Sequence, residues 1–211
     1  TVNSMYIDER GIIWIGTREG LNRYNGNDIK SFKLKKNDPN SLFSNTVLRI
    51  TGNKKGKVYL LCTDGIAEFD LTTQRFKTLL QGNVDAIYYN EKLYIGKREE
   101  VFVYNESTGN FDLYYHLAGK DITLSCLHLD DKKNLWMGTT GNGNYCLSEN
   151  KTVSQPITKG NITSIYEDSS KELWIGSWEE GLYHITTDGN IENLRHDPKN
   201  PNSLCSDFVR S

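Results

Sequence analysis

The sequence predicts an all-β fold made of repeated four-stranded units, and three observations support this prediction. A short apolar segment centred on Trp or Tyr recurs five times, at intervals of about 40 residues. Polar turns rich in glycine separate such segments, and no stretch shows the i, i+3, i+4, i+7 pattern of an amphipathic helix. Because Ile12–Ile15 is apolar on both faces of the expected strand, the sheet should be covered on both sides, as in the blades of a β-propeller.

The composition allows a folded core and excludes several functional classes. The chain has 211 residues, of which 36% are hydrophobic and 25% are charged. Its net charge of −2 provides no basic field for binding nucleic acid or an anionic membrane. The longest apolar stretches are far shorter than the ~20 residues of a membrane helix. Four cysteines at irregular spacing, without a Cys-x-x-Cys pair, exclude a zinc ribbon, so we predict neither a metal nor a cofactor.

The most regular feature of the repeats is an aromatic anchor that is followed, two residues later, by glycine. A glycine in a strand fits a place where a neighbouring blade approaches closely. We therefore expect the three tryptophan anchors to occupy equivalent, mostly buried positions. The anchors are Trp14, Tyr59, Tyr94, Trp136 and Trp174, and the glycines are Gly16, Gly96, Gly138 and Gly176.

Each anchor strand is expected to be the second of four antiparallel strands. An extended segment precedes it, and two further apolar segments follow. Three of the first turns are acidic, as in Asp8–Gly11, and these are interpreted as polar hairpin loops. The predicted β-propeller covers residues 1–211, with blades at about 1–43, 44–82, 83–120, 121–160 and 161–204, and the first strand of a sixth blade at 205–211. Since five blades and one strand leave a repeat incomplete, we expect a fragment of a larger propeller.

The best repeat, from Gly11 to Tyr24, resembles the two-component regulator propeller repeat. It reads Gly-Ile-Ile-Trp-Ile-Gly-Thr, followed by Gly-Leu-Asn-Arg-Tyr. The family's loop with Asp-Pro and Ser-Leu occurs twice, at residues 37–42 and 196–204. The first and fifth blades match well and the fourth moderately. The second and third depart, because Leu61 replaces the anchor glycine and Glu100 replaces the next one.

This resemblance implies a non-enzymatic sensor. In the family, such propellers form the periplasmic part of inner-membrane hybrid two-component regulators that control glycan-utilisation genes, with a histidine kinase elsewhere in the protein. The implied partners are an oligosaccharide ligand and a second copy of the receptor. Nucleic acid would not bind this domain, and the membrane would be reached only through segments outside this chain. Two alternatives stay open: a polysaccharide-active propeller enzyme (hydrolase or lyase), and a scaffold for protein interaction or dimerisation.

The candidate ligand site lies in the turns between the second and third strands of the blades. A sugar site needs an aromatic face for the C–H groups of the ring and planar polar groups for its hydroxyls. Trp178 is the tryptophan outside the anchor positions, and arginine side chains suit uronate or sulfate groups. The alternative interpretation is that the same residues are solvated turn tips. The candidate ligand-binding residues are Arg18, Glu19, Asp64, Arg98, Asn142, Trp178 and Glu179.

Other reactive side chains carry no catalytic prediction. Adjacent carboxylates such as Glu179 and Glu180, or Asp130 and Asp131, would point to opposite sides of a strand, so we interpret them as polar turns. The four histidines lack a metal-ligand spacing. Cys126 and Cys146 are expected on the first and third strands of blade four, ~9.6 Å apart, which exceeds the ~7 Å limit for a disulfide. Free, buried thiols are therefore predicted there, and Cys62 should pack as a small apolar residue.

Overall fold

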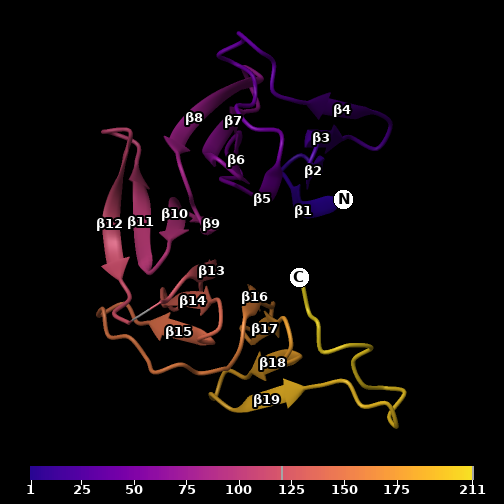
Figure 1. The fold of residues 1–211 in the computed structure, drawn as a ribbon, viewed down its shortest axis with the longest axis vertical. Helices are drawn as coiled ribbons and strands as arrows, with labels where there is room; N and C mark the ends of the chain where they lie inside the picture. Colours follow the sequence, from indigo (N-terminus) through magenta and orange to yellow (C-terminus); the bar gives the residue numbers. More distant parts are fainter. Residues whose placement is uncertain (120, 211) are drawn as a thin grey trace. The chain divides into compact units, whose positions relative to one another are not determined.

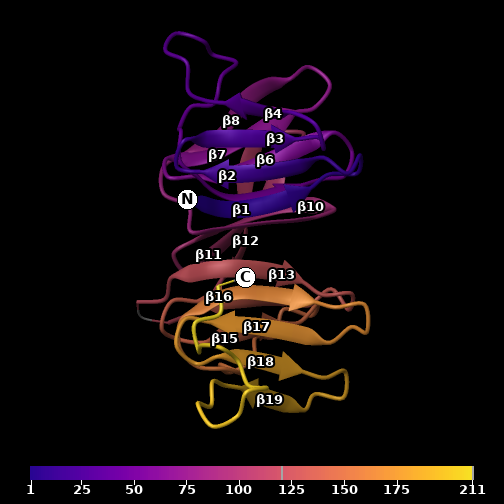
Figure 2. The same cartoon turned by 90° about the vertical axis from the view of Figure 1, so that its right-hand side faces the viewer.

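The computed structural model describes residues 1–119 and 121–210, and its regular elements are all strands. No helix that could cross a membrane occurs among these residues. The predicted all-β class is confirmed, because the strands form five antiparallel sheets in which each strand pairs with the next (Figures 1 and 2). The predicted end of blade three at residue 120, and residue 211, lie outside the described residues.

Each sheet corresponds to one predicted blade, numbered one to five along the chain. The strands are β1 (Val2–Ile7), β2 (Ile13–Thr17), β3 (Gly20–Tyr24) and β4 (Ile29–Phe32) in blade one; β5 (Val47–Gly52), β6 (Lys57–Cys62), β7 (Gly65–Asp70) and β8 (Arg75–Gln81) in blade two; β9 (Ala86–Asn90), β10 (Lys92–Lys97), β11 (Glu100–Asn105) and β12 (Asn110–His116) in blade three; β13 (Leu124–Leu129), β14 (Leu135–Thr139) and β15 (Asn144–Leu147) in blade four; and β16 (Ile162–Glu167), β17 (Leu173–Ser177), β18 (Leu182–Ile185) and β19 (Ile191–Leu194) in blade five.

The chain divides into two compact units. The first holds Thr1–Ile95 and Phe102–Tyr114, and the second holds Gly96–Val101 and the described residues after Tyr114. Blades one and two, with most of blade three, therefore belong to the first unit, and blades four and five to the second. Each unit is described by itself below.

The aromatic anchors form the cores between neighbouring blades. In the first unit, Trp14 lies 5.4 Å from Phe69 of blade two, ring centre to ring centre, and it is 1% exposed. Tyr59 stacks on Tyr89 of blade three at 5.5 Å and is fully buried. In the second unit, Trp136 is buried. Trp174 is only half-buried and stacks on His184 within its own blade, at 4.0 Å.

The anchor glycines lie where the following segment of chain packs directly against the blade. A Cβ atom on Gly16 would lie 2.8 Å from Val47 Cγ1, and one on Gly138 would lie 2.7 Å from Ile162 Cγ2. Val47 and Ile162 belong to the first strands of the next blades. A Cβ atom on Gly176 would likewise lie 2.9 Å from Val209 Cγ1. Residues 205–210 form no strand, yet Val209 N donates to Ser177 O at 2.9 Å.

Blade four departs from the others in its outermost strand. Residues 153–158 run beside β15, and the amides of Ser154 and Ile157 donate to the carbonyls of Cys146 and Asn144. The two donors are three residues apart, whereas the two acceptors on β15 are two residues apart, so this segment contains one extra residue. Pro156 lies within it and has no N–H to donate, so a regular strand does not form there.

The acidic turns position the tryptophan anchors. The indole N–H of Trp14 donates to Asp8 Oδ2 at 3.0 Å. Trp136 donates to Asp130, and Trp174 to Asp168, both at 2.9 Å. The interpretation of these turns as polar hairpin loops missed this role, although the carboxylate and the indole recur six residues apart in each case.

The four cysteines lie among the described residues, and none of them forms a disulfide. Cys126 lies on β13 and Cys146 on β15, which are the first and third strands of blade four. Cys146 is half-buried rather than buried. Burial raises the pKa of the Cys62 thiol to about 12 and that of Cys146 to about 11. Both thiols therefore stay protonated at neutral pH and behave as apolar groups.

Candidate functional site

All the predicted ligand-binding residues lie in turns that join the second and third strands of a blade. Arg18 and Glu19 are in the β2–β3 turn, and Asp64 is in the β6–β7 turn. In the second unit, the turns hold Arg98 and Asn142, and then Trp178 with Glu179. Because every blade is an antiparallel meander, this turn lies at the same end of its sheet as the loop that leads to the next blade.

In the first unit, the acidic turn residues have different surroundings. The carboxylate of Asp64 accepts hydrogen bonds from Ser44 Oγ at 2.9 Å and from Thr63 Oγ1 at 3.0 Å. Glu19 is 82% exposed and pairs with Lys33 at 3.6 Å. Arg18 is exposed. Asp64 is therefore held by its blade and by the preceding loop, whereas Arg18 and Glu19 are exposed to solvent.

In the second unit, Arg98 and Asn142 lie in turns that are fixed by the backbone. Arg98 has a left-handed φ of 52°, its carbonyl accepts the amide of Leu124 at 2.8 Å, and its Nε lies 3.4 Å from Glu99. The amide of Asn142 donates to Thr139 Oγ1 at 3.2 Å. Hydrogen bonds therefore fix the backbone of both turns, and the polar side chains of the turns lie at the surface.

Trp178 forms an exposed aromatic pair with Phe208. The two ring centres lie 5.4 Å apart at an interplanar angle of 89°, so one edge meets one face. Trp178 is 44% exposed and Phe208 is 57% exposed. The amide of Trp178 donates to Asn161 O at 2.9 Å, which fixes the turn. Such a pair offers an apolar face to solvent beside the carboxylates of the same turn.

Arg195 ties this turn to the loop after blade five. Its guanidinium donates to Glu180 at 2.8 Å, to Asp207 at 2.9 Å and to the carbonyl of Glu179 at 2.9 Å. The hydrogen bond from Arg195 and the one from the His196 amide hold the pKa of Asp207 below its usual range. Arg195, Asp207 and Phe208 were missed by the sequence reasoning, because only the fold of the loop brings them to Trp178. The sequence similarity between this loop and residues 37–42 is the signal that could have pointed to them.

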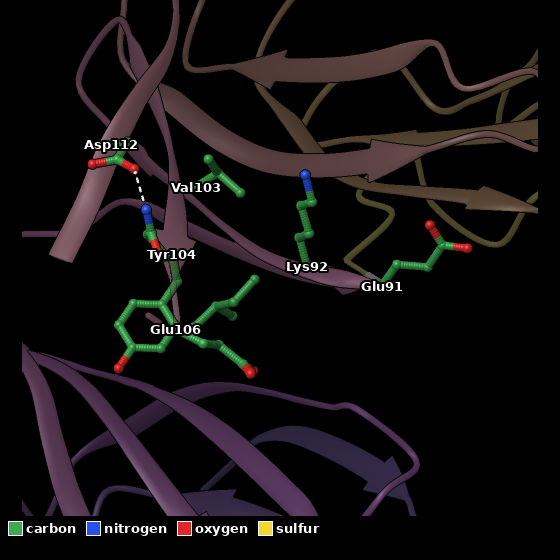
Figure 3. Close-up of a pocket in the computed structure, with 8 residues that line it drawn as sticks. Glu91, Lys92, Val103, Tyr104, Glu106 and Asp112 are labelled. Carbon is green, nitrogen blue, oxygen red and sulfur yellow. Dashed lines mark hydrogen bonds between the residues drawn. The ribbon is translucent and has the colours of Figure 1, made fainter. Parts of the chain in front are cut away.

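A separate pocket of about 430 Å³ lies at the opposite end of blade three. It is formed by the β9–β10 and β11–β12 turns, with Glu91 and Lys92 from the first turn and Glu106 and Asp112 from the second hairpin (Figure 3). The Asp112 carboxylate accepts a hydrogen bond from Asn105 at 2.9 Å. The pocket is polar and of mixed charge, and it is not part of the predicted turns.

Carboxylates, histidines and cysteines do not gather into a metal-binding group in the part of the chain that the structure describes. Asp130 is buried beneath Trp136, whereas the neighbouring Asp131 is exposed and lies 3.6 Å from Lys171. The paired carboxylates Asp130 and Asp131 thus have separate structural contacts.

Comparison with known proteins finds one family profile in two segments of the chain. The two-component regulator propeller profile matches residues 1–19 and 156–179, which include the anchors Trp14 and Trp174. No curated protein sequence matches the chain.

Solved structures share the fold. The extracellular domain of BT3049 from B. thetaiotaomicron, described as a candidate hybrid two-component system, is 24% identical, with a TM-score of 0.84 over 100% of this chain and 30% of its own. The extracellular domain of BT4673 from the same organism is 18% identical, with a TM-score of 0.67 over 99% of this chain and 35% of its own.

An enzyme has a similar fold. Virginiamycin B lyase from Staphylococcus aureus is 16% identical, with a TM-score of 0.75 over 93% of this chain and 71% of its own. The chain spans about a third of the length of the two extracellular domains. The chain therefore has a β-propeller fold, and two of its segments match the two-component regulator propeller profile.

Proposed function

We propose that this chain is part of the ligand-sensing, extracytoplasmic propeller of a membrane-bound two-component regulator. The observation that carries the proposal is the match of the whole chain to the extracellular domain of BT3049, combined with the regulator repeats in blades one and five. In this proposal the propeller faces the periplasm, and a histidine kinase in another part of the protein receives the signal. The propeller itself has no catalytic task.

The proposed ligand is an oligosaccharide released from a polysaccharide. The support comes from the exposed Trp178–Phe208 pair, which presents an aromatic face, and from the carboxylates of the same turn. Arg18 and Arg98 add guanidinium groups suited to uronate or sulfate. Binding would need several polar contacts besides an aromatic one, because each saccharide contact is weak and must offset the lost freedom of the ligand. The ligand would control glycan-utilisation genes through the intact, dimeric receptor.

Titration calorimetry of the sensor region that contains this chain tests the proposal. Candidate oligosaccharides are titrated into the wild type and into Trp178→Ala and Arg98→Ala variants. Trp178→Ala should weaken binding by about 1–3 kcal/mol, a typical loss for an aromatic contact. Tyr166→Ala is a matched control, because Tyr166 is an aromatic residue that is 62% exposed but lies on β16. Equal affinities for all four proteins would reject this face as the ligand site.

A lyase function is the second candidate, and the fold of virginiamycin B lyase favours it. An eliminating enzyme would form a carbon–carbon double bond in its product, which absorbs ultraviolet light. Incubation of the sensor region with candidate polysaccharides, followed by absorbance and product sizing, distinguishes cleavage from binding. Turnover would replace the sensor proposal, whereas binding without turnover would support it.

A further inference from the structure

Two loops of the chain fold alike. In residues 33–46, which join β4 to β5, the amide of Lys35 donates to Ser41 Oγ at 3.0 Å, and Ser41 Oγ donates to the Asp38 carbonyl at 2.9 Å. In residues 195–208, which follow β19, the amide of Asp197 donates to Ser203 Oγ at 2.9 Å, and Ser203 Oγ donates to the Asn200 carbonyl at 2.8 Å. The two loops therefore share one hydrogen-bond pattern, although Asn37 has a left-handed φ of 67° and the residue at the same place in the second loop, Lys199, does not.

Further hydrogen bonds place the two loops in register. The amide of Leu34 donates to the Asn45 side chain at 2.7 Å, and the amide of His196 donates to the Asp207 side chain at 2.8 Å. Leu34 thus corresponds to His196, and the residues that follow correspond one by one.

The surfaces of the two loops differ although their hydrogen-bond patterns agree. Leu34 is 49% exposed, and Lys35 and Lys36 beside it are also exposed. Their counterparts in the second loop are His196, Asp197 and Pro198. On β4, Lys30 pairs with Arg23, which pairs with the anchor Trp14. On β19, Glu192 pairs with His184, which pairs with the anchor Trp174. Lys30 therefore corresponds to Glu192. The loop structure therefore needs neither the exposed leucine nor the lysines.

Two concavities flank the first loop. One, of about 820 Å³, is lined by Leu34, Lys35, Lys36, Pro39 and Phe43 among others. The other, of about 250 Å³, lies between β4 and the start of β8 and includes Lys30, Lys33 and Lys35. Together the linings hold four lysines, and the acidic residue among them is Asp38, whose carboxylate accepts the amide of Asn40 at 3.0 Å. Glu19 lies outside the linings and pairs with Lys33 at 3.6 Å, so the four lysines and these two carboxylates together remain positive. All these residues belong to the first unit.

We propose that this lysine-rimmed loop surface, formed by Lys30–Phe43 and the start of β8, docks an acidic polypeptide segment that carries aliphatic side chains. Charge complementarity identifies the occupant: the rim is positive in a chain whose net charge is −2. Leu34, Pro39 and Phe43 supply an apolar floor, which suits aliphatic side chains. A chain of glutamate or aspartate alternating with leucine would place its carboxylates on the rim and its apolar groups on that floor. This surface is separate from the Trp178 turn, so the inference does not depend on the proposed ligand.

Fluorescence anisotropy with a labelled peptide of alternating glutamate and leucine tests the proposal on the full chain. The wild type should bind the peptide, and a peptide with glutamine in place of glutamate should bind at least about tenfold more weakly. Raising the salt concentration to about 1 M should weaken the first peptide strongly, because the Debye length falls to about 3 Å.

The sequence of the second loop provides the test variant for the first loop. The double substitution Leu34→His with Lys35→Asp introduces the side chains that the second loop carries at the equivalent positions. The backbone amides make matching hydrogen bonds there in both loops, so the fold should be preserved. It should weaken peptide binding by about tenfold or more. The control Lys132→Asp changes one charge in the same way, in the exposed β13–β14 turn, and should leave binding unchanged. Unfolding curves of all variants verify that they are folded.

Three outcomes would overturn the proposal. The first is absence of peptide binding by the wild type. The second is equal binding by the wild type and the folded double variant. The third is binding of polygalacturonate in place of the peptide, with the same dependence on Lys35, which would identify the surface as a polysaccharide site.

Discussion

Blades one and two bury an aromatic anchor at the same place, yet their hydrogen bonds differ. In blade one, the buried Asp8 accepts the indole N–H of Trp14 and also the amides of Arg10 and Ile12. In blade two, Asn53 takes the turn position and accepts the amides of Lys55 and Lys57, while the anchor is Tyr59. Among the described residues, the hydroxyl of Tyr59 has no hydrogen-bond partner.

This difference explains why two sequence changes occur together in blade two. A buried indole N–H needs an acceptor, and a buried carboxylate needs donors. When tyrosine replaces tryptophan, the indole N–H that binds the turn carboxylate is absent, and an uncharged asparagine can still close the turn. The loss of the acidic turn and the change of anchor therefore have the same physical cause, which is the hydrogen bond between the carboxylate and the indole. Blade two departs from the repeat, yet its anchor Tyr59 is fully buried.

The largest expected effect concerns the residue two positions after the anchor. Leu61 is 2% exposed and occupies the place of Gly16 in blade one. Leu61→Ala should lower the free energy of unfolding by about 2–5 kcal/mol, because it leaves a cavity between blades two and three. Gly16→Ala should cost about 1–3 kcal/mol for the opposite reason, since its Cβ would meet Val47. Denaturant unfolding measures both, and a neutral Gly16→Ala would contradict the close approach of Val47.

The second prediction separates the two kinds of turn. Asp8→Ala should destabilise the protein by about 2–3 kcal/mol, because the Trp14 indole and the turn amides lose their acceptor. Asn53→Ala removes turn acceptors but leaves no indole unpaired, so about 1 kcal/mol is expected. Thermal or denaturant unfolding of the two variants provides the comparison. Equal losses would show that the indole hydrogen bond adds nothing.

The third prediction concerns pH. Burial raises the pKa of Asp8, but hydrogen bonds from Arg10, Trp14 and the turn backbone outweigh it, so this pKa is lowered. The Trp174 indole and the turn amides likewise lower the pKa of Asp168. A lowered carboxyl pKa contributes stability that is present above the unfolded value of about 3.9 and is lost as the pH falls through the folded value. Stability should therefore decline below about pH 4, and Asp8→Asn should make this decline shallower. An unchanged slope would contradict the assignment.

The smallest effect is expected in the turns that face solvent. Glu180 pairs with Arg195 at 2.8 Å, as Glu19 pairs with Lys33 at 3.6 Å in blade one. Both pairs are exposed, so Glu180→Gln and Glu19→Gln should each change the free energy of unfolding by about 0–1 kcal/mol. The Glu180 variant should show the larger change, because Arg195 also binds Asp207. Unfolding curves that shifted more for Glu19→Gln would contradict this order.

The repeat pattern predicted the blades because the anchors, glycines and turns act within short stretches of sequence. Trp14 and Gly16 mark one strand, and their spacing alone locates the hairpin. The outer strand of blade four could not be foreseen in this way, since Pro156 and the extra residue act through pairing with β15. The Trp178 turn was located correctly, but its neighbours Arg195 and Phe208 arrive through a long loop. Contacts made by such loops depend on tertiary structure and leave only a faint local signal.

The intrinsic fluorescence of Trp178 provides the most direct test of the sensing account. Trp178 is 44% exposed, whereas Trp14 and Trp136 are buried. Titration of the sensor region with candidate oligosaccharides should shift the emission of the wild type toward shorter wavelength, because the ligand would displace water from the indole. Trp178→Phe should abolish that shift while the protein stays folded. A ligand that binds by calorimetry but leaves the emission of the wild type unchanged would contradict the account.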